Sequence, residues 1–529
     1  MSETGISRRQ LALTLIAGFA AVAVAGVLLR PLVPIDETRY VDVAWEMRLR
    51  GSWFLPLKNF DLYTDKPPLL FWLINLVWTV TGGVTGFAAR LVAPAFAVGA
   101  LLGTWALGRR LWDDATGALA ATILAGMSIF AIYGGATMFD TLLACATLGG
   151  IWALLDAFRA PRFDARSWAL LGLALGFGVL AKGPVILFHL GPVIAAFPLW
   201  SAPNRRPAGR DIARGLGLAL IVALAIVALW VVPAAITGGA EYRHMILWEQ
   251  TAGRTVQSFA HARPWFWLIA TLPAVLFPWI FVPGLWRGFA TLRRDDRALR
   301  LVLVQALAGL ALFSLISGKQ IHYLIPELPA VALIFARALI GDARDMSRDW
   351  RGALPVALIT ALLGIGLLGV ALGLWGDAKT AALIAPLPPV AAFAALCLLL
   401  AFAALRLPRA AGMATLGLGL VLGLAGLIGT TALEPAYDSA PIAHELAAHE
   451  AQGIAVVTDR YNAEFGFEGR LTQPVDLPEP DQAAGWLAAH PGGMLAGECK
   501  AVPLDPAQAI KVFFYGADWC LWEAPTKTP

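Results

Sequence analysis

The residues best suited to chemistry concentrate in the stretch from residue 31 to residue 87. Asp36 and Glu37 follow directly after the first apolar segment, and Tyr63 and Lys66 lie further along the same stretch. A carboxylate can accept a proton from an attacking hydroxyl, and a lysine can bind a phosphate group and stabilise its charge. An acidic pair can also simply mark the end of a membrane segment, so the spacing alone leaves both interpretations open.

Further polar residues interrupt the apolar segments that follow. Asp140 begins the segment DTLLA, where an acid could equally cap a helix or favour its dipole. Lys182, in LAKGP, lies between two apolar segments and must be paired or extend toward the membrane surface. Lys319 and Tyr323, in GKQIHYLIPELP, place a cation and a phenol beside another apolar segment. Together these residues suggest a ligand with an anionic head and a long apolar tail.

Arginines and aromatic residues are mixed in the stretch from residue 234 to residue 264. Arg254 and Arg263 are the arginines nearest its end. The planar guanidinium suits bidentate phosphate binding. Non-specific attraction to anionic lipid headgroups is the simpler alternative.

The composition shows what must position these residues. The chain has 529 residues, of which 58% are hydrophobic, and its mean hydropathy is +0.69. Apolar runs of roughly 16 to 22 residues recur from residue 11 to residue 432, about the length that crosses a bilayer as a helix. The net charge of +4 is small and argues against nucleic acid as a partner. The sequence therefore predicts a polytopic α-helical membrane protein.

The arginine-rich loops orient the predicted membrane segments. With a cytoplasmic N-terminus and thirteen crossings, every such loop lies on the cytoplasmic side, as basic loops should. The predicted crossings are approximately 11–30, 88–108, 115–134, 138–158, 166–181, 184–200, 213–233, 265–285, 300–316, 325–340, 353–375, 386–405 and 411–432. All the polar sites described above then lie on the opposite, periplasmic side.

This topology requires that the apolar stretch from Leu69 to Val80 does not cross the membrane. Residues 31–87 are therefore predicted to form one periplasmic juxtamembrane loop, with helices on or in the outer leaflet. Residues 234–264 form a second periplasmic loop. Residues 1–432 are predicted to make up one transmembrane domain, which would be the catalytic domain if the polar sites described above form an active site.

A polar tail from residue 433 to residue 529 follows the last apolar segment. Its helix-like and strand-like segments predict a small periplasmic α/β domain. Cys499 and Cys520 both lie in it, and in an oxidising compartment they could form a disulfide.

The opening loop resembles that of bacterial polyprenyl-phosphate-dependent glycosyltransferases, the group that includes the lipid A aminoarabinose transferase and is related to protein O-mannosyltransferases. The segments FDTLLA, LAKGP, HARPWFW and GKQIHYLIPELP look like later family segments, in the same order. The residues of the opening loop that match the family pattern are Asp36, Glu37, Arg39, Tyr40, Glu46, Met47, Gly51, Trp53, Tyr63, Lys66 and Pro67.

The resemblance implies the GT-C fold, with about thirteen transmembrane helices and a periplasmic C-terminal domain. It also implies an inverting hexosyl- or pentosyltransferase in the bacterial inner membrane. The expected donor is a sugar on a polyprenyl phosphate, undecaprenyl phosphate above all. The acceptor would be a lipid A-like lipid or another envelope molecule, and a protein acceptor is the closest enzymatic alternative.

Residue roles follow from the resemblance as hypotheses. Asp36 would be the catalytic carboxylate. The other predicted roles are donor phosphate binding by Lys66, Arg254, Arg263 and Lys319, and a sugar or acceptor pocket formed by Glu37, Tyr63, Asp140 and Tyr323. No cofactor is certain, and a divalent metal ion stays open, with Glu249 and His261 as weak candidate ligands.

Two other classes of protein have to be weighed against an enzyme. A transporter or flippase of lipid-linked sugars would carry charges inside its membrane segments and inverted repeats. Here the apolar segments are nearly free of ionisable residues, and the polar sites gather on one side. A non-catalytic envelope scaffold gives no reason for the motifs around Asp36 and Lys66.

Overall fold

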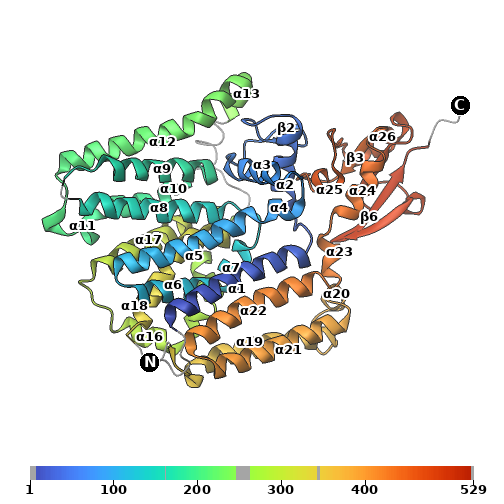
Figure 1. Ribbon diagram of the computed structural model, residues 1–529. Coiled ribbons are helices and arrows are strands. Elements are labelled where there is room, and N and C mark those ends of the chain that lie inside the picture. The colour runs from blue at the N-terminus through green and yellow to red at the C-terminus, as the bar shows by residue number, and fades with distance from the viewer. Residues whose placement is uncertain (1–6, 161, 246–261, 342–345, 526–529) are drawn as a thin grey trace.

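Long apolar helices make up most of the protein and lie roughly side by side (Figure 1). The computed structural model describes residues 7–160, 162–245, 262–341 and 346–525. Among these residues ten helical segments are long and apolar enough to cross a membrane. They are Arg8–Leu29 (α1), Gly86–Leu111 (α4, α5), Asp140–Arg159 (α8), Ala165–Ala195 (α9, η1, α10), Gly209–Thr237 (α12), Arg297–Leu315 (α17), Ile321–Leu339 (η5, α18), Trp350–Ala371 (α19), Leu387–Arg406 (α21) and Arg409–Ile428 (α22).

The predicted number of thirteen crossings is not confirmed, because several predicted segments are broken helices. Helices α6 (Asp114–Gly126) and α7 (Ser128–Gly134) bend by 71° and make an eleventh candidate if they count as one. The segment predicted at 265–285 consists of α15 (Trp267–Val275), η4 (Trp279–Phe281) and the start of α16 (Pro283–Phe289). None of these three pieces is long enough by itself to cross a bilayer.

The chain reverses within the stretch from residue 165 to residue 195. Helix α9 (Ala165–Lys182) is capped by Gly183, which has a positive φ. Helix α10 (Ile186–Ala195) follows. Trp168, near the start of α9, and Trp200, beyond the end of α10, both pack on Phe158. The two helices therefore run in opposite directions, as predicted from the sequence.

The loop from residue 31 to residue 87 begins and ends at the same end of the helical bundle. Arg90, in α4 (Gly86–Arg90), donates hydrogen bonds to the carbonyls of Val27 and Arg30 at the end of α1. Helix α3 (Leu69–Thr81) has only 13 residues, about 20 Å of helix, which is too short for a bilayer. The short helix and these contacts favour the prediction that this stretch does not cross, which stays a prediction.

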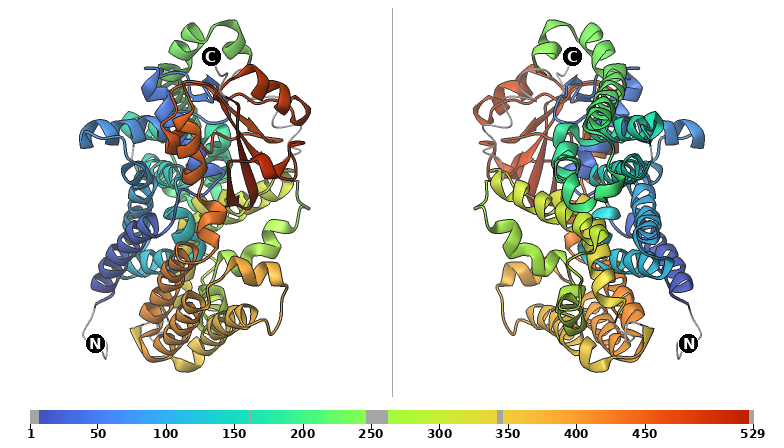
Figure 2. Two further views of the ribbon diagram at one scale, coloured as in Figure 1. Left: turned by 90° about the vertical axis from the view of Figure 1, so that its right-hand side faces the viewer. Right: turned by 90° about the vertical axis from the view of Figure 1, so that its left-hand side faces the viewer.

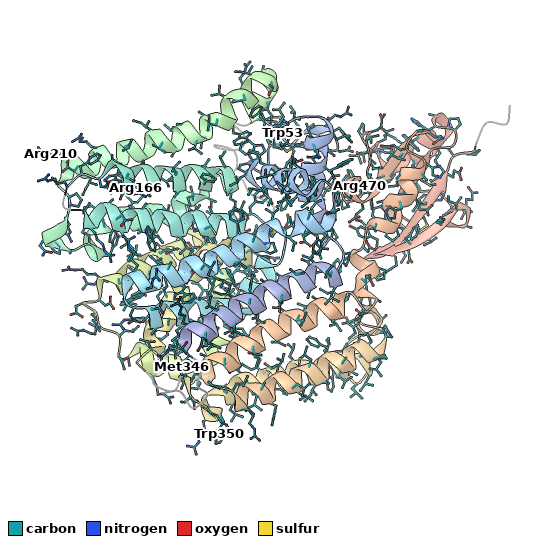
Figure 3. The ribbon with its side chains drawn as sticks, viewed as in Figure 1. Trp53, Arg166, Arg210, Met346, Trp350 and Arg470 are labelled. Atoms are coloured by element: carbon teal, nitrogen blue, oxygen red, sulfur yellow. A yellow bond between two sulfur atoms is a disulfide. The ribbon has the colours of Figure 1, made fainter. Side chains whose placement is uncertain are left out.

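Helix α2 (Asp36–Leu49) and α3 cover this end of the bundle and lie between the long helices and the C-terminal domain (Figures 1 and 2). Arg166 and Arg210 lie at the other end, whereas Trp53 lies near the C-terminal domain, to which Arg470 belongs (Figure 3). The indole of Trp230, near the end of α12, donates to the carbonyl of Phe54. The loops predicted to share one side of the membrane therefore do meet at one end.

The tail folds into a small domain of helices around one sheet. Strands β3 (Ile454–Val457), β4 (Met494–Glu498), β6 (Ala517–Glu523) and β5 (Lys511–Tyr515) lie in that order. Strands β3 and β4 are parallel and the other pairs are antiparallel. The accompanying helices are α23 (Leu433–Tyr437), α24 (Ala440–Ala448), α25 (Gly466–Gly469) and α26 (Ala483–Ala489). Cys499 and Cys520 form a disulfide, which the sequence had left open, with Cα atoms 5.0 Å apart.

Candidate active site

Asp36 is the first residue of α2 and lies at the surface of the bundle end. Its Oδ1 accepts hydrogen bonds from Arg39, at 2.5 Å, and from the hydroxyl of Tyr40, at 2.8 Å. The side chain remains 37% exposed. Burial favours the neutral acid, but Arg39, Tyr40, Lys66 and His322 outweigh it and hold the pKa of Asp36 below its ordinary value. Asp36 is therefore an ionised carboxylate with one face open.

The positive charge of Lys66 helps to lower the pKa of Asp36, so the two side chains lie within electrostatic range of each other. This proximity joins the acid and the cation that the sequence placed in one loop. Tyr63 is buried in the same neighbourhood, with its ring 6.5 Å from Phe71 and with an electrostatic effect on Arg39. The loop thus folds back so that its cation and phenol lie close to the start of α2.

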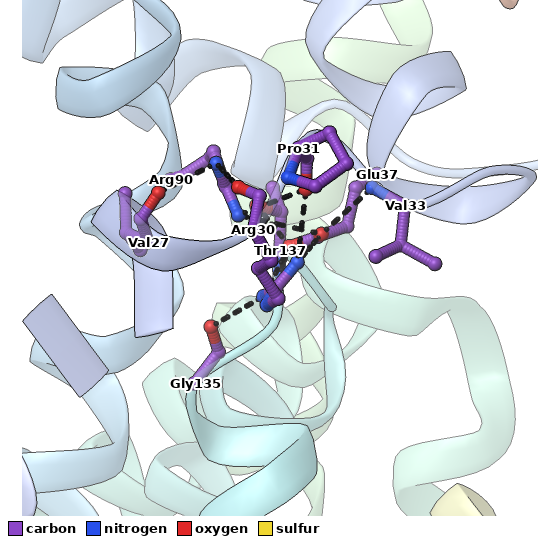
Figure 4. A network of polar contacts seen from close by, with 8 residues as sticks. All are labelled: Val27, Arg30, Pro31, Val33, Glu37, Arg90, Gly135 and Thr137. Atoms are coloured by element: carbon purple, nitrogen blue, oxygen red, sulfur yellow. Dashed lines mark hydrogen bonds and ion pairs between the residues drawn. The ribbon is translucent and has the colours of Figure 1, made fainter. Parts of the chain in front are cut away.

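Glu37, the next residue of α2, lies in a buried ion cluster (Figure 4). Both of its oxygens pair with the guanidinium of Arg30, and Arg90 lies 4.0 Å from Oε2. The backbone N–H of Thr137 donates to Oε1 at 2.8 Å and that of Val33 to Oε2 at 3.2 Å. Burial opposes ionisation, but the two arginines and Thr137 lower the pKa of Glu37 to about 2. These contacts favour a role in holding α2 over the predicted role in a sugar pocket.

Asp140 and Lys182 form a second acid–base pair beside the first. The ammonium of Lys182 lies 2.5 Å from Oδ1 of Asp140, and it sits over the ring of Tyr323, 4.9 Å from the ring centre. Asp140 is the first residue of α8 and not its cap, which is Phe139. The imidazole of His322 packs on Tyr323, with ring centres 4.9 Å apart, and also influences Asp36. Asp140 and Tyr323 therefore lie near the site, as predicted.

The ammonium of Lys319 is engaged by backbone carbonyls. It donates to Arg263 at 2.9 Å, to Ser317 at 3.5 Å and to Ile316. The side chain is only 3% exposed. It thus joins the chain at residue 263 to the end of α17, and its predicted phosphate contact stays a prediction. The guanidinium of Arg263 lies over the ring of Trp267, 5.7 Å from its centre.

Arg254, Glu249 and His261 lie outside the described residues. Within the described part of the chain, no group of three or more His, Cys, Asp and Glu side chains is placed to hold a metal ion. The metal ligands and one phosphate ligand therefore stay predictions.

Several residues that shape the site were missed from the sequence. Arg30 and Arg90 hold Glu37, and Asn462 of the C-terminal domain contacts Arg39. The two arginines did carry a signal, because each is a lone cation at the end of an apolar segment. Asn462 carried none, since it is one polar residue among many in a polar tail.

The fold and the site together define a polytopic membrane protein with a carboxylate and cations at one end of its bundle. ArnT from Cupriavidus metallidurans bound to undecaprenyl phosphate has the same architecture, with a TM-score of 0.75 over 98% of this chain and 99% of that one, at 18% identity. The archaeal oligosaccharyltransferase AglB from Archaeoglobus fulgidus aligns with a TM-score of 0.52, at 14% identity, over 92% of this chain and 69% of that one. The chain therefore has the GT-C fold.

Sequence comparison identifies a family match and relatives of this chain. Residues 65–231 match the family described as dolichyl-phosphate-mannose-protein mannosyltransferase. An undecaprenyl phosphate-alpha-4-amino-4-deoxy-L-arabinose arabinosyl transferase from Pseudomonas aeruginosa is 31% identical over 70% of this chain and 65% of its own length. One from Pectobacterium carotovorum is 30% identical over 63% and 61%. In sequence the chain is similar to these aminoarabinose transferases, and it spans just under two thirds of the length of these curated relatives.

Proposed function

We propose that this protein is an inverting glycosyltransferase that uses a sugar linked to undecaprenyl phosphate. The donor class is that named for its curated relatives, and the acceptor is a lipid A-like lipid or another envelope molecule. The carrying observation is that Asp36 lies at the bundle end as an ionised, partly open carboxylate, within electrostatic range of Lys66. A phosphate at the head of a lipid tail in the outer leaflet would reach this position.

The reaction needs one base and a stabilised leaving group. Asp36 accepts the proton of the acceptor hydroxyl while that oxygen forms a bond to the anomeric carbon. The bond from this carbon to the phosphate oxygen breaks, and the polyprenyl phosphate departs with the electron pair. Lys66, with Arg254 or Arg263, stabilises the charge that it gains. One carboxylate without a separate nucleophile favours direct displacement with inversion.

The orientation in the membrane is part of the proposal. Arg166 and Arg210 lie at the end of the bundle that faces away from the C-terminal domain (Figure 3). Basic loops are retained in the cytoplasm. The active site and the C-terminal domain therefore face the periplasm, where the disulfide between Cys499 and Cys520 would persist.

A protein acceptor is the second candidate. Residues 65–231 match the family described as dolichyl-phosphate-mannose-protein mannosyltransferase, whose name gives a protein as the acceptor. A hydroxyl of a serine or threonine could therefore take the place of the lipid hydroxyl. The same base and leaving-group chemistry would serve both acceptors. Lipid and peptide acceptors supplied in parallel to one donor distinguish them.

The test is transfer of a radiolabelled sugar from synthetic undecaprenyl phosphate-aminoarabinose to lipid A in proteoliposomes. Replacing Asp36 by Asn should lower the rate by about 10²- to 10⁴-fold, the usual contribution of a positioned base. Asp61→Asn is the matched control, because Asp61 is an exposed acid of the same loop. Full activity of Asp36→Asn would refute the assignment, and relocation of intact donor without transfer would indicate a transporter.

A further inference from the structure

A turn of the C-terminal domain, residues 460–464, reaches the loop that carries the active site. Oδ1 of Asn462 lies 3.5 Å from the guanidinium of Arg39. The ammonium of Lys58 donates to the carbonyl of Tyr461 at 3.2 Å. A separate contact lies nearby, where the amide of Asn59 exchanges hydrogen bonds of 2.9 and 2.8 Å with the backbone of Val475. The domain is therefore attached to the active-site loop at several points.

Arg39 connects this turn to Asp36. One nitrogen of its guanidinium binds Asp36, at 2.5 Å, and another faces Asn462. The group also lies over the ring of Tyr40, 5.2 Å from the ring centre. The side chains of Arg39 and Asn462 are both largely buried, at 13% and 5% exposed. A guanidinium held on three sides keeps one direction toward the carboxylate, because its donors are fixed in a planar fork.

The amide of Asn462 is itself held by its own turn. Its Nδ2 donates to the carbonyl of Arg460 at 3.1 Å, and its backbone N–H donates to Glu464 at 2.9 Å. Because the NH₂ group is used inside the turn, the carbonyl oxygen of the amide is the atom that faces Arg39. The acceptor for the guanidinium is therefore presented by the fold of the C-terminal domain.

We infer that Asn462 is a positioning residue of the active site, through which the C-terminal domain holds Arg39 against the carboxylate of Asp36. This inference rests on the proposed function, since it takes Asp36 to be the reacting group. The domain is then part of the catalytic unit, to which it contributes through Arg39.

The test measures the protonation of Asp36 directly. The full-length protein in detergent is treated with a water-soluble carbodiimide, which modifies protonated carboxyls, over a series of pH values. Labelling of the Asp36 peptide is read by mass spectrometry. In Asn462→Ala, Arg39 is free to turn away, so labelling on the acid side should rise about two- to threefold. That is a fraction of the roughly tenfold or greater change expected on removing an opposite charge altogether.

Two further variants make the outcome decisive. Asn462→Ser can still bond within the turn but is too short to reach Arg39, so it should give the same rise and serves if the alanine variant does not fold. Asn59→Ala removes two bonds of the domain without touching Arg39 and should leave labelling unchanged. Wild-type labelling in Asn462→Ser, or an equal rise in Asn59→Ala, would overturn the inference.

Sugar transfer is measured on the same variants. The acid limb of the pH–rate profile should move to higher pH in Asn462→Ala, together with the labelling. Absence of transfer in the wild-type protein would count against the proposed function alone, since the labelling result does not depend on turnover.

Discussion

Replacement of Glu37 by Gln tests whether this residue anchors α2 or lines the sugar pocket. The change keeps the shape of the side chain and removes its charge. The pKa of Glu37 falls from 4.5 to about 2 in the folded protein. At about 1.4 kcal/mol for each factor of ten, this corresponds to about 3 kcal/mol of stabilisation. The side chain is only 4% exposed, so solvent screening reduces this figure little.

A second, independent estimate of the stabilisation by Glu37 has the same size. Removing one partner from a buried ion pair costs about 3 to 5 kcal/mol, because the remaining charge stays buried without compensation. Here Arg30 and Arg90 would both lose their acid. In a chain of this length, about 3 kcal/mol lowers Tm by roughly 3 to 5 °C.

The pH dependence of this stabilisation follows from the sign of the shift. Because the folded-state pKa lies below the unfolded one, the stabilisation is fully present above pH 4.5 and is lost as the pH falls through about 2. The difference in Tm between Glu37→Gln and the wild type should therefore be constant from pH 6 to 8. It should shrink only in acid.

The assay is thermal unfolding in detergent, followed by tryptophan fluorescence. Asp211→Asn is the matched control, because its partners Arg210 and Arg214 are exposed and 4.0 and 3.9 Å away. Such a surface pair contributes about 0 to 1 kcal/mol. A Glu37→Gln protein with wild-type Tm and a raised KM for the donor would refute the anchoring role and favour the pocket.

Three other changes test the packing of the C-terminal domain. Burial and Glu46 raise the pKa of Asp42 well above its ordinary value, so the free energy of unfolding falls as the pH rises above about 4. Asp42→Asn should therefore raise Tm at pH 8 and leave it unchanged at pH 4. A Cβ at Gly466 would overlap Asp42 Oδ1, so Gly466→Ala should lower Tm, whereas Gly485→Ala, which meets open space, should not. Replacing both Cys499 and Cys520 by serine should lower the free energy of unfolding of this domain by about 3 kcal/mol, the value for a closed loop of this size. Calorimetry measures this difference.

The architecture could be predicted because hydropathy and arginine placement act over long segments. The decision that Leu69–Val80 does not cross rested on the positions of arginines far from it, and the contacts of Arg90 with the end of α1 agree. The exact number of membrane crossings was harder to predict from the sequence. The stretch from α15 to α16 contains Pro278 and Pro283, and a hydropathy window averages such single residues away.

The site could be predicted only in outline. Sequence spacing placed Asp36, Lys66, Asp140 and Tyr323 at one end of the bundle, since each lies at the end of an apolar segment. It could not say which way each side chain points. Lys319 bonds to nearby carbonyls because the chain turns back at residue 318, where Gly318 bridges to Ala262. Such local geometry has no signature in the spacing.

The acidic pair illustrates how the helix divides two roles between neighbours. Successive residues of an α-helix point about 100° apart, so Asp36 and Glu37 cannot face the same partner. Glu37 is held by charges from the ends of α1 and α4, and this contact sets the rotation of the first turn of α2. With that rotation set, Asp36 lies on a different side of the turn, where its side chain is partly exposed and pairs with Arg39. The buried Glu37 therefore sets the direction of Asp36, the carboxylate that we propose as the base.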